Sequence, residues 1–262
     1  MAISTAFNNL GKTVMHWVDE TGALAIFLGR SLLKVFHYRQ PPFIIQQLYY
    51  IGAKSIHIVA LVGLFTGMVL GLQLYYALTR VGSTGLIGMV IVIALVRELG
   101  PVLTAIMITA RAGSSMATEI GIQRMSEQID ALHTMRIDSI GYLVSPRLTA
   151  CIISFPLLTA LFDLIGILGG YISSVFMLGL NGGNYFYGVR TSLDINDITG
   201  GFIKAIVFGI IVCTVCCFQG YFTHMRSDGH GAKSVGLSTT SAVVISCVLI
   251  LVADYVITAL IL

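Results

Sequence analysis

Five long apolar segments, separated by shorter polar stretches, account for most of this chain. They cover residues 56–76, 85–110, 148–178, 201–222 and 241–262. Each reaches the roughly 20 residues that a helix needs to cross about 30 Å of hydrocarbon. The runs are continuous rather than alternating, which favours helices over the strands of a membrane barrel. We therefore predict an all-α polytopic membrane protein, with one transmembrane domain over residues 1–262 and five spans.

The composition agrees with this pattern. Hydrophobic residues make up 56% of the 262 residues and charged residues only 10%, against roughly 45–50% and 25% in soluble domains. So few charges could not cover the surface of a soluble protein. The net charge is +3 and no block of Lys or Arg is present, which excludes nucleic acid as a partner.

The N-terminal region predicts a helix that lies in the membrane interface. Residues 1–20 lack an apolar centre and end in an acidic pair, so they do not form a cleavable signal peptide. Over residues 20–38, basic side chains at Arg30 and Lys34 share one side of a helical wheel, and apolar ones share another: Leu24, Leu28, Leu32, Val35 and Phe36. A sixth, short span is the alternative.

Basic residues are unevenly divided between the loops. The segment before the first span holds five, loop 111–147 holds four and loop 223–240 holds two, whereas the opposite side has only Arg80 and Arg190. Lys and Arg are enriched in cytoplasmic loops. We therefore expect the N-terminus in the cytoplasm and the C-terminus on the periplasmic side.

A charged pair inside the second span suggests function. Arg97 and Glu98 stand in the second span, where a charge costs about 2.5–3.5 kcal/mol and faces a cavity or a partner. Pro101 leaves the carbonyl of Arg97 without its usual helical donor. The pair forms either a structural ion pair with Asp163 or Asp254, or, as we prefer, a polar spot in a transport cavity.

Small residues recur along the first span. Gly63, Gly67 and Gly71 form a helix face without side chains, which another backbone can approach closely. That neighbour is either another span of this chain or a second subunit. The sequence leaves both open.

Loop 111–147 contains an amphipathic segment, residues 119–132. Its apolar positions are Ile122, Met125, Ile129 and Leu132, and its other face mixes acidic and basic side chains. A membrane-surface helix would carry a basic face. The mixed charge favours docking to a soluble protein, and packing beneath the chain's own spans is the alternative.

Several enzymatic and metal-site patterns are incomplete. Cys213, Cys216 and Cys217 have no second Cys pair or nearby His, so we expect them to pack in a helix rather than bind metal. Residues 11–13 resemble the end of a phosphate-binding loop, but Ala6 stands where that loop requires Gly. We predict neither a metal site, nor an ATP site, nor catalysis in this chain.

The stretch over residues 95–132, LVRELGPVLTAIMITARAGSSMATEIGIQRMSEQIDAL, strongly resembles the signature of the MlaE permease family. The similarity extends to residues 47–49, 67–73 and 145–147 and covers most of the chain. The resemblance implies the membrane subunit of an ABC transporter that moves glycerophospholipids between the inner membrane and the periplasm and so maintains the lipid asymmetry of the outer membrane. It implies no cofactor in this chain, since ATP and Mg²⁺ would bind a partner.

The resemblance also implies partners: a second copy of the chain, an MlaF-like cytoplasmic ATPase, an MlaB-like STAS-domain protein and an MlaD-like hexamer of MCE proteins. By the same analogy a coupling helix over residues 119–132 contacts the ATPase through Glu119, Ile122, Arg124, Met125, Glu127, Gln128 and Asp130. A lipid pocket at the dimer axis would be lined by Leu70, Leu74, Leu78, Val81, Glu98 and Leu99. Val81 departs from the larger aromatic residue expected at the mouth of that pocket.

A rival hypothesis needs no ATPase. The ionisable residues within the spans could form the relay of an ion-coupled secondary transporter or channel: Arg97, Glu98, Asp163 and Asp254. Secondary transporters commonly contain an internal repeat, and none is visible in this sequence.

Overall fold

A computed structural model of the chain describes residues 21–34, 41–225 and 231–261. Within these ranges the regular structure is helical throughout, without strands. Five helical segments are long and apolar enough to cross a membrane, which confirms the predicted number of spans. Residues 11–13 and the predicted end of the interfacial helix, residues 35–38, lie outside the described ranges.

The first two spans are built from several helices in series. The first comprises α2 (Pro41–Ile51), the short η1 (Ala53–Ser55) and α3 (Ile56–Thr79). The second runs without a break through η2 (Thr84–Leu86), α4 (Ile87–Ala94), the π-helical turn η3 (Leu95–Leu99), α5 (Gly100–Ile108), the π-helical turn η4 (Thr109–Gly113) and α6 (Ser114–Met125).

The remaining spans are simpler. The third is α9 (Ser145–Tyr171) with the π-helical turn η5 (Ile172–Met177), the fourth is α11 (Ile195–Tyr221) and the fifth is α12 (Ala232–Ile261). Shorter helices lie between spans: α7 (Gln128–Thr134), α8 (Ser139–Leu143), α10 (Gly182–Ser192) and η6 (Thr223–Met225). Most spans extend beyond their predicted bounds, because an apolar run marks only the part of a helix within hydrocarbon.

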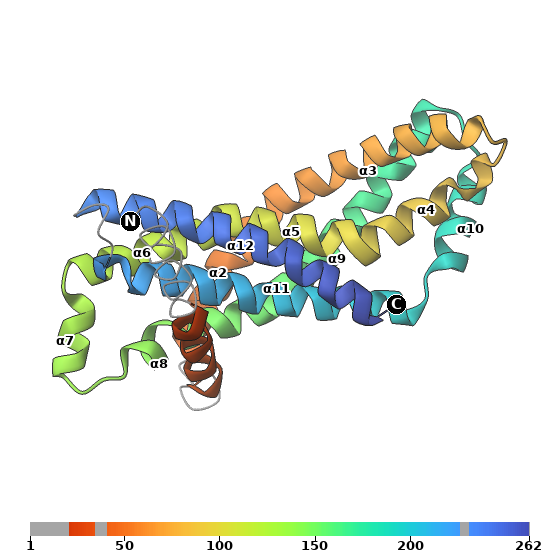
Figure 1. Ribbon diagram of the computed structural model, residues 1–262. Coiled ribbons are helices and arrows are strands. Elements are labelled where there is room, and N and C mark those ends of the chain that lie inside the picture. Colours follow the sequence, from red (N-terminus) through yellow and green to blue (C-terminus); the bar gives the residue numbers. More distant parts are fainter. Residues whose placement is uncertain (1–20, 35–40, 226–230, 262) are drawn as a thin grey trace, which may run out of the picture.

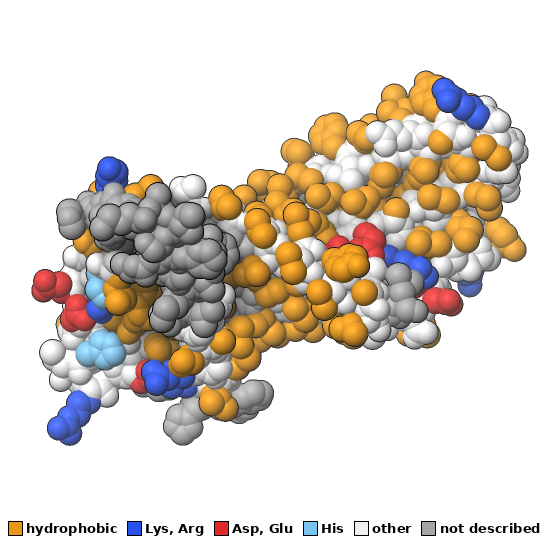
Figure 2. Space-filling view, in the orientation of Figure 1, with side chains coloured by type: hydrophobic (Ala, Val, Ile, Leu, Met, Phe, Trp, Pro, Cys, Tyr) orange, Lys and Arg blue, Asp and Glu red, His pale blue; other side chains and the backbone are white. Residues whose placement is uncertain are grey.

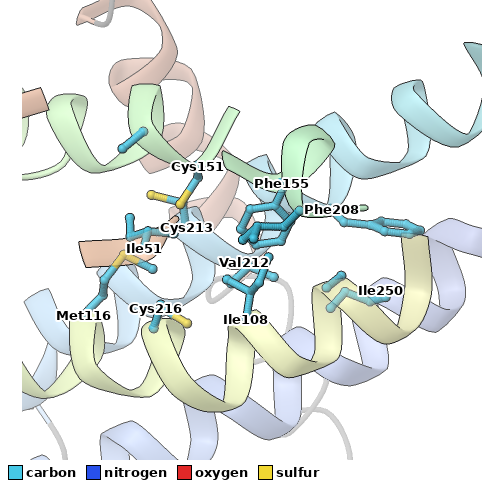
Figure 3. Packing of buried hydrophobic residues seen from close by; sticks show 14 of the residues in the cluster. Ile51, Ile108, Met116, Cys151, Phe155, Phe208, Val212, Cys213, Cys216 and Ile250 are labelled. Carbon is cyan, nitrogen blue, oxygen red and sulfur yellow. The ribbon is translucent and has the colours of Figure 1, made fainter. Parts of the chain in front are cut away.

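The spans lie side by side in an elongated bundle, with α6, α7 and α8 at one end and α10 at the other (Figure 1). Helix α11 is the central element: 67% of its most apolar window is buried, against 11% for α12. It contacts α6, α9 and α12. Figure 3 shows Phe208 and Val212 of α11 packed against Phe155 of α9 and Ile108 of the second span.

The cysteines belong to this core. Cys151, Cys213, Cys216 and Cys217 are buried free thiols, and the sulfurs of Cys213 and Cys217 are 3.9 Å apart. Their placement among Ile51, Met116 and other apolar side chains confirms the packing role expected of them (Figure 3).

The glycine face of α3 packs on α9 of the same chain. A side chain at Gly67 would collide with the carbonyl oxygen of Gly166, and one at Gly63 would lie 3.0 Å from that of Phe162. At Gly71 the obstructing atom is the hydroxyl oxygen of Ser173. The structure thus decides between the two open alternatives in favour of packing within the chain.

The helix over residues 21–34 lies across the bundle rather than along it (Figure 1). Its anchor is Phe27, which is 3% exposed and packs edge-on against Phe218 of α11 at a ring-centre distance of 5.7 Å. Lys34 forms an ion pair with Asp138, between α7 and α8. The face that packs on the bundle is therefore centred on Phe27. The predicted apolar face did not include this residue, so that prediction is corrected here.

Substitution of Gly67 tests the close approach of α3 and α9. Gly67→Ala places a methyl group against the backbone of Gly166, and overpacking of this kind costs about 1–3 kcal/mol. We expect a lower thermal unfolding temperature for the purified protein in detergent. Gly236→Ala on α12 is the matched control, since nothing lies within 4 Å of its added carbon. Equal unfolding temperatures for the two variants would contradict the proposed contact.

Candidate functional site

A buried lysine joins three of the five spans. Lys204 of α11 has a side chain that is 4% exposed. Its ammonium nitrogen lies 2.8 Å from Oε2 of Glu98 in η3 and 2.9 Å from Oδ1 of Asp254 in α12. It also donates a hydrogen bond of 2.9 Å to the carbonyl oxygen of Arg97. The ammonium group therefore donates two hydrogen bonds, to Glu98 and to the carbonyl of Arg97, and forms an ion pair with Asp254.

The backbone acceptor follows from the sequence. Pro101 has no N–H group, so the carbonyl of Arg97 lacks its ordinary helical donor. The helix forms a π turn over residues 95–99 immediately before this point, and Lys204 supplies the missing donor. The prediction that Pro101 frees this carbonyl is confirmed.

Arg97 has a partner of its own. Its Nε lies 2.8 Å from Oδ1 of Asp197, near the start of α11. Glu98 also accepts a hydrogen bond of 3.3 Å from the hydroxyl of Thr258. The structural ion pair considered from the sequence therefore has other members: Arg97 binds Asp197 rather than Asp163 or Asp254, and Lys204 bridges Glu98 to Asp254.

These charges border a cavity of about 480 Å³. Its walls come from the end of α4, from η3, from the loop before α11, from α11 and from α12. They include Arg97, Glu98, Asp194, Asp197, Lys204 and Thr258. Gly200 and Gly201 contribute no side chain there. Figure 2 shows acidic and basic side chains grouped within an otherwise hydrophobic flank. The cavity thus offers both signs of charge beside apolar surface.

Asp163 does not belong to this network. It lines a different cavity, formed by α9, α11 and Val96. The relay that the rival hypothesis needs is therefore divided, because Arg97, Glu98 and Asp254 are grouped and Asp163 is apart. Sequence reasoning missed Lys204, Asp197 and Thr258 as members of the network. The available signal was the single charge of Lys204 within an apolar span.

The six predicted lipid-contacting residues are not brought together within one chain. Only Glu98 borders the charged cavity. Leu99 and three leucines of α3, namely Leu70, Leu74 and Leu78, are partly buried against the core. Val81 lies beyond the end of α3 and is 74% exposed.

The predicted single helix over residues 119–132 is wrong. Helix α6 ends at Met125 and α7 begins at Gln128. Between them Ser126 donates its hydroxyl to the carbonyl of Ile122, and Glu127 adopts a left-handed backbone with φ of 60°. Ser side chains that bond to the backbone compete with helical geometry. The segment therefore forms two helices joined by a bend, and we call residues 119–134 the elbow.

The elbow presents a different surface from the one expected. Ile129 is fully buried, whereas Ile122 is 54% exposed and Met125 is 37% exposed. The apolar positions therefore do not form one buried face. Glu127, Gln128 and Asp130 are exposed as well. The exposed set mixes apolar and acidic side chains at the end of the bundle.

Three of the predicted coupling residues, Glu119, Arg124 and Asp130, form ion pairs within the chain. Arg147, 5% exposed, binds Glu119 at 3.1 Å. Arg124 binds Asp130 at 2.6 Å and donates to Nδ1 of His224 at 3.0 Å. Burial and the charge of Arg124 lower the pKa of His224, which keeps the imidazole neutral and able to accept. The pair of Glu119 and Arg147 fixes the elbow to α9, and the bond of Arg124 to His224 fixes it to η6, beyond α11.

Comparison with known proteins agrees with this architecture. The family model described as Permease MlaE matches residues 44–260. A Rickettsia bellii protein named as a probable ABC transporter permease is 42% identical over 257 residues, covering 97% of this chain and 96% of the relative. The intermembrane phospholipid transport system permease protein MlaE of Haemophilus influenzae is 35% identical over 253 residues, covering 96% and 95%.

A plant protein is also similar. The chloroplastic protein TRIGALACTOSYLDIACYLGLYCEROL 1 of Arabidopsis thaliana is 35% identical over 241 residues, which cover 90% of this chain and 67% of the plant protein.

The role of Lys204 can be measured. Lys204→Met leaves Glu98 and Asp254 without their cation, and removing one partner of a buried ion pair costs about 3–5 kcal/mol. We expect a large fall in the thermal unfolding temperature of the purified protein. We expect the unfolding temperature to recover most of this loss when Glu98→Gln and Asp254→Asn are added to Lys204→Met. Lys233→Met, at an exposed position of α12, is the control. A triple variant no more stable than the single one would contradict this account.

Proposed function

The chain belongs to the MlaE permease family, and on that basis we propose that it moves glycerophospholipids between the inner membrane and a periplasmic MCE partner. In this proposal it is the non-catalytic membrane subunit of an ABC transporter that maintains outer-membrane lipid asymmetry. The observation that carries the proposal is the similarity, over nearly the whole chain, to a permease named for intermembrane phospholipid transport.

The charged cavity supports a polar-headed substrate. A phospholipid head carries a phosphate and often a cationic or hydroxyl group, and Arg97 and Asp197 offer complementary charges beside apolar walls. We place Glu98 and Lys204 as the residues that hold the shape of this cavity. The acyl chains then lie along the partly buried leucines Leu70, Leu74, Leu78 and Leu99.

A second copy of the chain completes the lipid pocket in this proposal. The outer side of α3 carries exposed apolar side chains, among them Leu61, Phe65 and Val69. Val81 is open at the end of this helix. Two such surfaces facing each other would enclose a path that neither chain encloses alone.

The elbow at residues 119–134 serves as the contact with the ATPase. Its exposed residues Ile122, Met125, Glu127 and Gln128 supply mixed apolar and polar surface, which suits a soluble protein partner. ATP and Mg²⁺ would bind that partner, which we take to carry the STAS-domain protein as well. Hydrolysis there would shift the elbow and, through the second span, the cavity.

The same end of the molecule faces the cytoplasm in this proposal. Arg124 and Arg136 of the elbow region lie there, whereas the opposite end carries Arg80 and Arg190. We propose a location in the bacterial inner membrane, with the C-terminus periplasmic and the MCE hexamer above the end that carries α10.

Transport by the reconstituted complex tests the proposal. The complete complex in proteoliposomes should transfer a fluorescent phospholipid only with ATP. Glu98→Gln keeps a hydrogen bond to Lys204, and Asp254 still balances the lysine charge, so we expect at least a tenfold fall in rate with only a small fall in the unfolding temperature. Asp194→Asn, at the exposed rim of the cavity, should stay within twofold. Transfer that persists without ATP and stops with a proton uncoupler would favour the ion-coupled rival instead.

Charge reversal at the elbow tests the ATPase contact. Glu127 is exposed, so Glu127→Lys alters the docking surface without breaking the pair between Arg124 and Asp130. We expect co-purification of the ATPase to fall at least fivefold, and further with Asp130→Lys. Arg80→Glu at the opposite end is the control and should retain the ATPase. If Glu127→Lys and Asp130→Lys together left co-purification intact, the elbow would not be the contact.

A further inference from the structure

Two cations meet at one tyrosine ring where the first and second spans touch. Tyr50 lies in the last turn of α2, and the ammonium nitrogen of Lys54 is 5.0 Å from the centre of its ring. The guanidinium carbon of Arg111, in η4, is 5.5 Å from the same centre. The phenol oxygen of Tyr50 lies 2.6 Å from the hydroxyl oxygen of Ser115 in α6, which holds the ring in place. We call Tyr50, Lys54 and Arg111 the cation cluster.

The cation cluster has no negative partner within the described part of the chain, where no carboxylate lies within ion-pair distance of Lys54 or Arg111. One terminal nitrogen of Arg111 donates to the carbonyl of Tyr50 at 3.0 Å and to the hydroxyl of Ser55 at 2.8 Å. The other N–H groups of the guanidinium and those of the Lys54 ammonium have no acceptor among the described residues. Two like charges beside one ring also repel each other, and more strongly where lipid replaces water. The cluster therefore suits an anion supplied from outside the chain.

The cation cluster lies at the boundary of the hydrocarbon layer. The apolar run of the first span begins at residue 56, directly after Ser55, and that of the second span ends at residue 110, directly before Arg111. The hydrogen bond between Arg111 and Ser55 brings these two boundaries to the same depth. The polar head groups of a bilayer lie just outside its hydrocarbon core, and Tyr side chains favour the same depth. An anion that reaches the cluster from the membrane is thus the phosphate of a lipid.

The surface beside the cluster suits the rest of a lipid molecule. Lys54 is exposed, and its ammonium nitrogen is also 5.8 Å from the ring centre of Tyr49, which is 61% exposed. On the hydrocarbon side Ile56 and Ile58 are 42% and 39% exposed. Charge at the boundary followed by exposed apolar side chains matches an amphiphile rather than a free ion. Neither Lys54 nor Arg111 borders the charged cavity, so the cluster is separate from the proposed transport path.

We propose that the cation cluster binds the phosphate of an anionic phospholipid in the leaflet on the elbow side of the bundle. Arg111 offers its remaining N–H groups in a planar fork that suits phosphate oxygens, and Lys54 adds a flexible point charge from the exposed side. A zwitterionic lipid also has a phosphate, but the cluster repels its cationic head group, so a lipid with net negative charge is preferred. The proposal requires that the chain spans a membrane and does not depend on the substrate that it carries.

Photo-crosslinking to the purified complex in phosphatidylcholine nanodiscs tests the proposal. The probe is a phosphatidylglycerol with a diazirine on the first carbons of one acyl chain, and the comparison probe is a phosphatidylcholine with the same chains and diazirine. Labelled peptides are mapped by mass spectrometry. We expect the phosphatidylglycerol to label residues 45–58 or 108–115 at least fivefold more than the phosphatidylcholine does. Unlabelled dioleoylphosphatidylglycerol should compete, whereas inorganic phosphate at the same concentration should not.

Variants separate the cluster from the general charge of the protein. Lys54→Met removes one cation from an exposed position and should lower labelling by phosphatidylglycerol at least threefold, whereas Lys54→Arg should stay within twofold. Arg111→Lys keeps the charge but loses the planar fork, and it should also lower labelling at least threefold. Lys233→Met removes the same charge from an exposed position of α12 and is the matched control, with labelling within twofold. Unfolding temperatures in phosphatidylcholine alone show that each variant is folded.

Four results would overturn the proposal. Equal labelling of the native protein by the two probes would show contact with bulk lipid only, and no labelling of either segment would show that another chain of the complex covers the cluster. Unchanged labelling in folded Lys54→Met, or an equal fall in Lys233→Met, would mean that the cluster is not the site. Labelling that inorganic phosphate displaces and dioleoylphosphatidylglycerol does not would identify a site for free anions instead.

Discussion

A single charge in an apolar helix organises the centre of this molecule. Lys204 cannot be buried without acceptors for its ammonium protons, since an unpaired charge at membrane depth costs several kcal/mol. The chain supplies acceptors through Glu98 and through a backbone carbonyl that Pro101 has left free, and a second counter-charge through Asp254 of another span. The positions of η3 and α12 on α11 depend on this requirement.

A second constraint acts where no charge is present. In a lipid environment apolar side chains gain little by leaving lipid for protein, so helices associate through close packing and hydrogen bonds. Helices α3 and α9 use this route, with Gly67 against Gly166. Helices α4 and α10 do the same, because a side chain at Gly188 would lie 3.1 Å from the backbone nitrogen of Met89. Glycine contacts therefore join the first span to the third, and the lysine network joins the second to the fourth and fifth.

The sequence predicted the spans well and the site only in part. Spans are visible because hydrocarbon thickness imposes a length and a composition on each helix. The freed carbonyl of Arg97 was predictable because Pro101 acts locally. The partners of Lys204 were not, since they lie about 50 and 100 residues away in the chain and meet only through packing. The prediction of one helix over residues 119–132 was wrong for a local reason. The apolar spacing fits one helix, but Ser126 and Glu127 interrupt it.

The second span connects the two regions that the proposed function requires. It is continuous from Thr84 to Met125, with the lysine network near its middle and the elbow at its end. Its other π turn, η4, carries Arg111, which donates hydrogen bonds to the carbonyl of Tyr50 and the hydroxyl of Ser55. A displacement of the elbow therefore reaches the charged cavity along one helix while that helix remains tied to the first span. Near the middle of this span Glu98 is held by α11 and α12, so movement of the second span must either carry those helices with it or alter the bonds of Lys204. In the proposed mechanism, the ion network is the place where a rigid-body shift of this span would change the shape of the cavity.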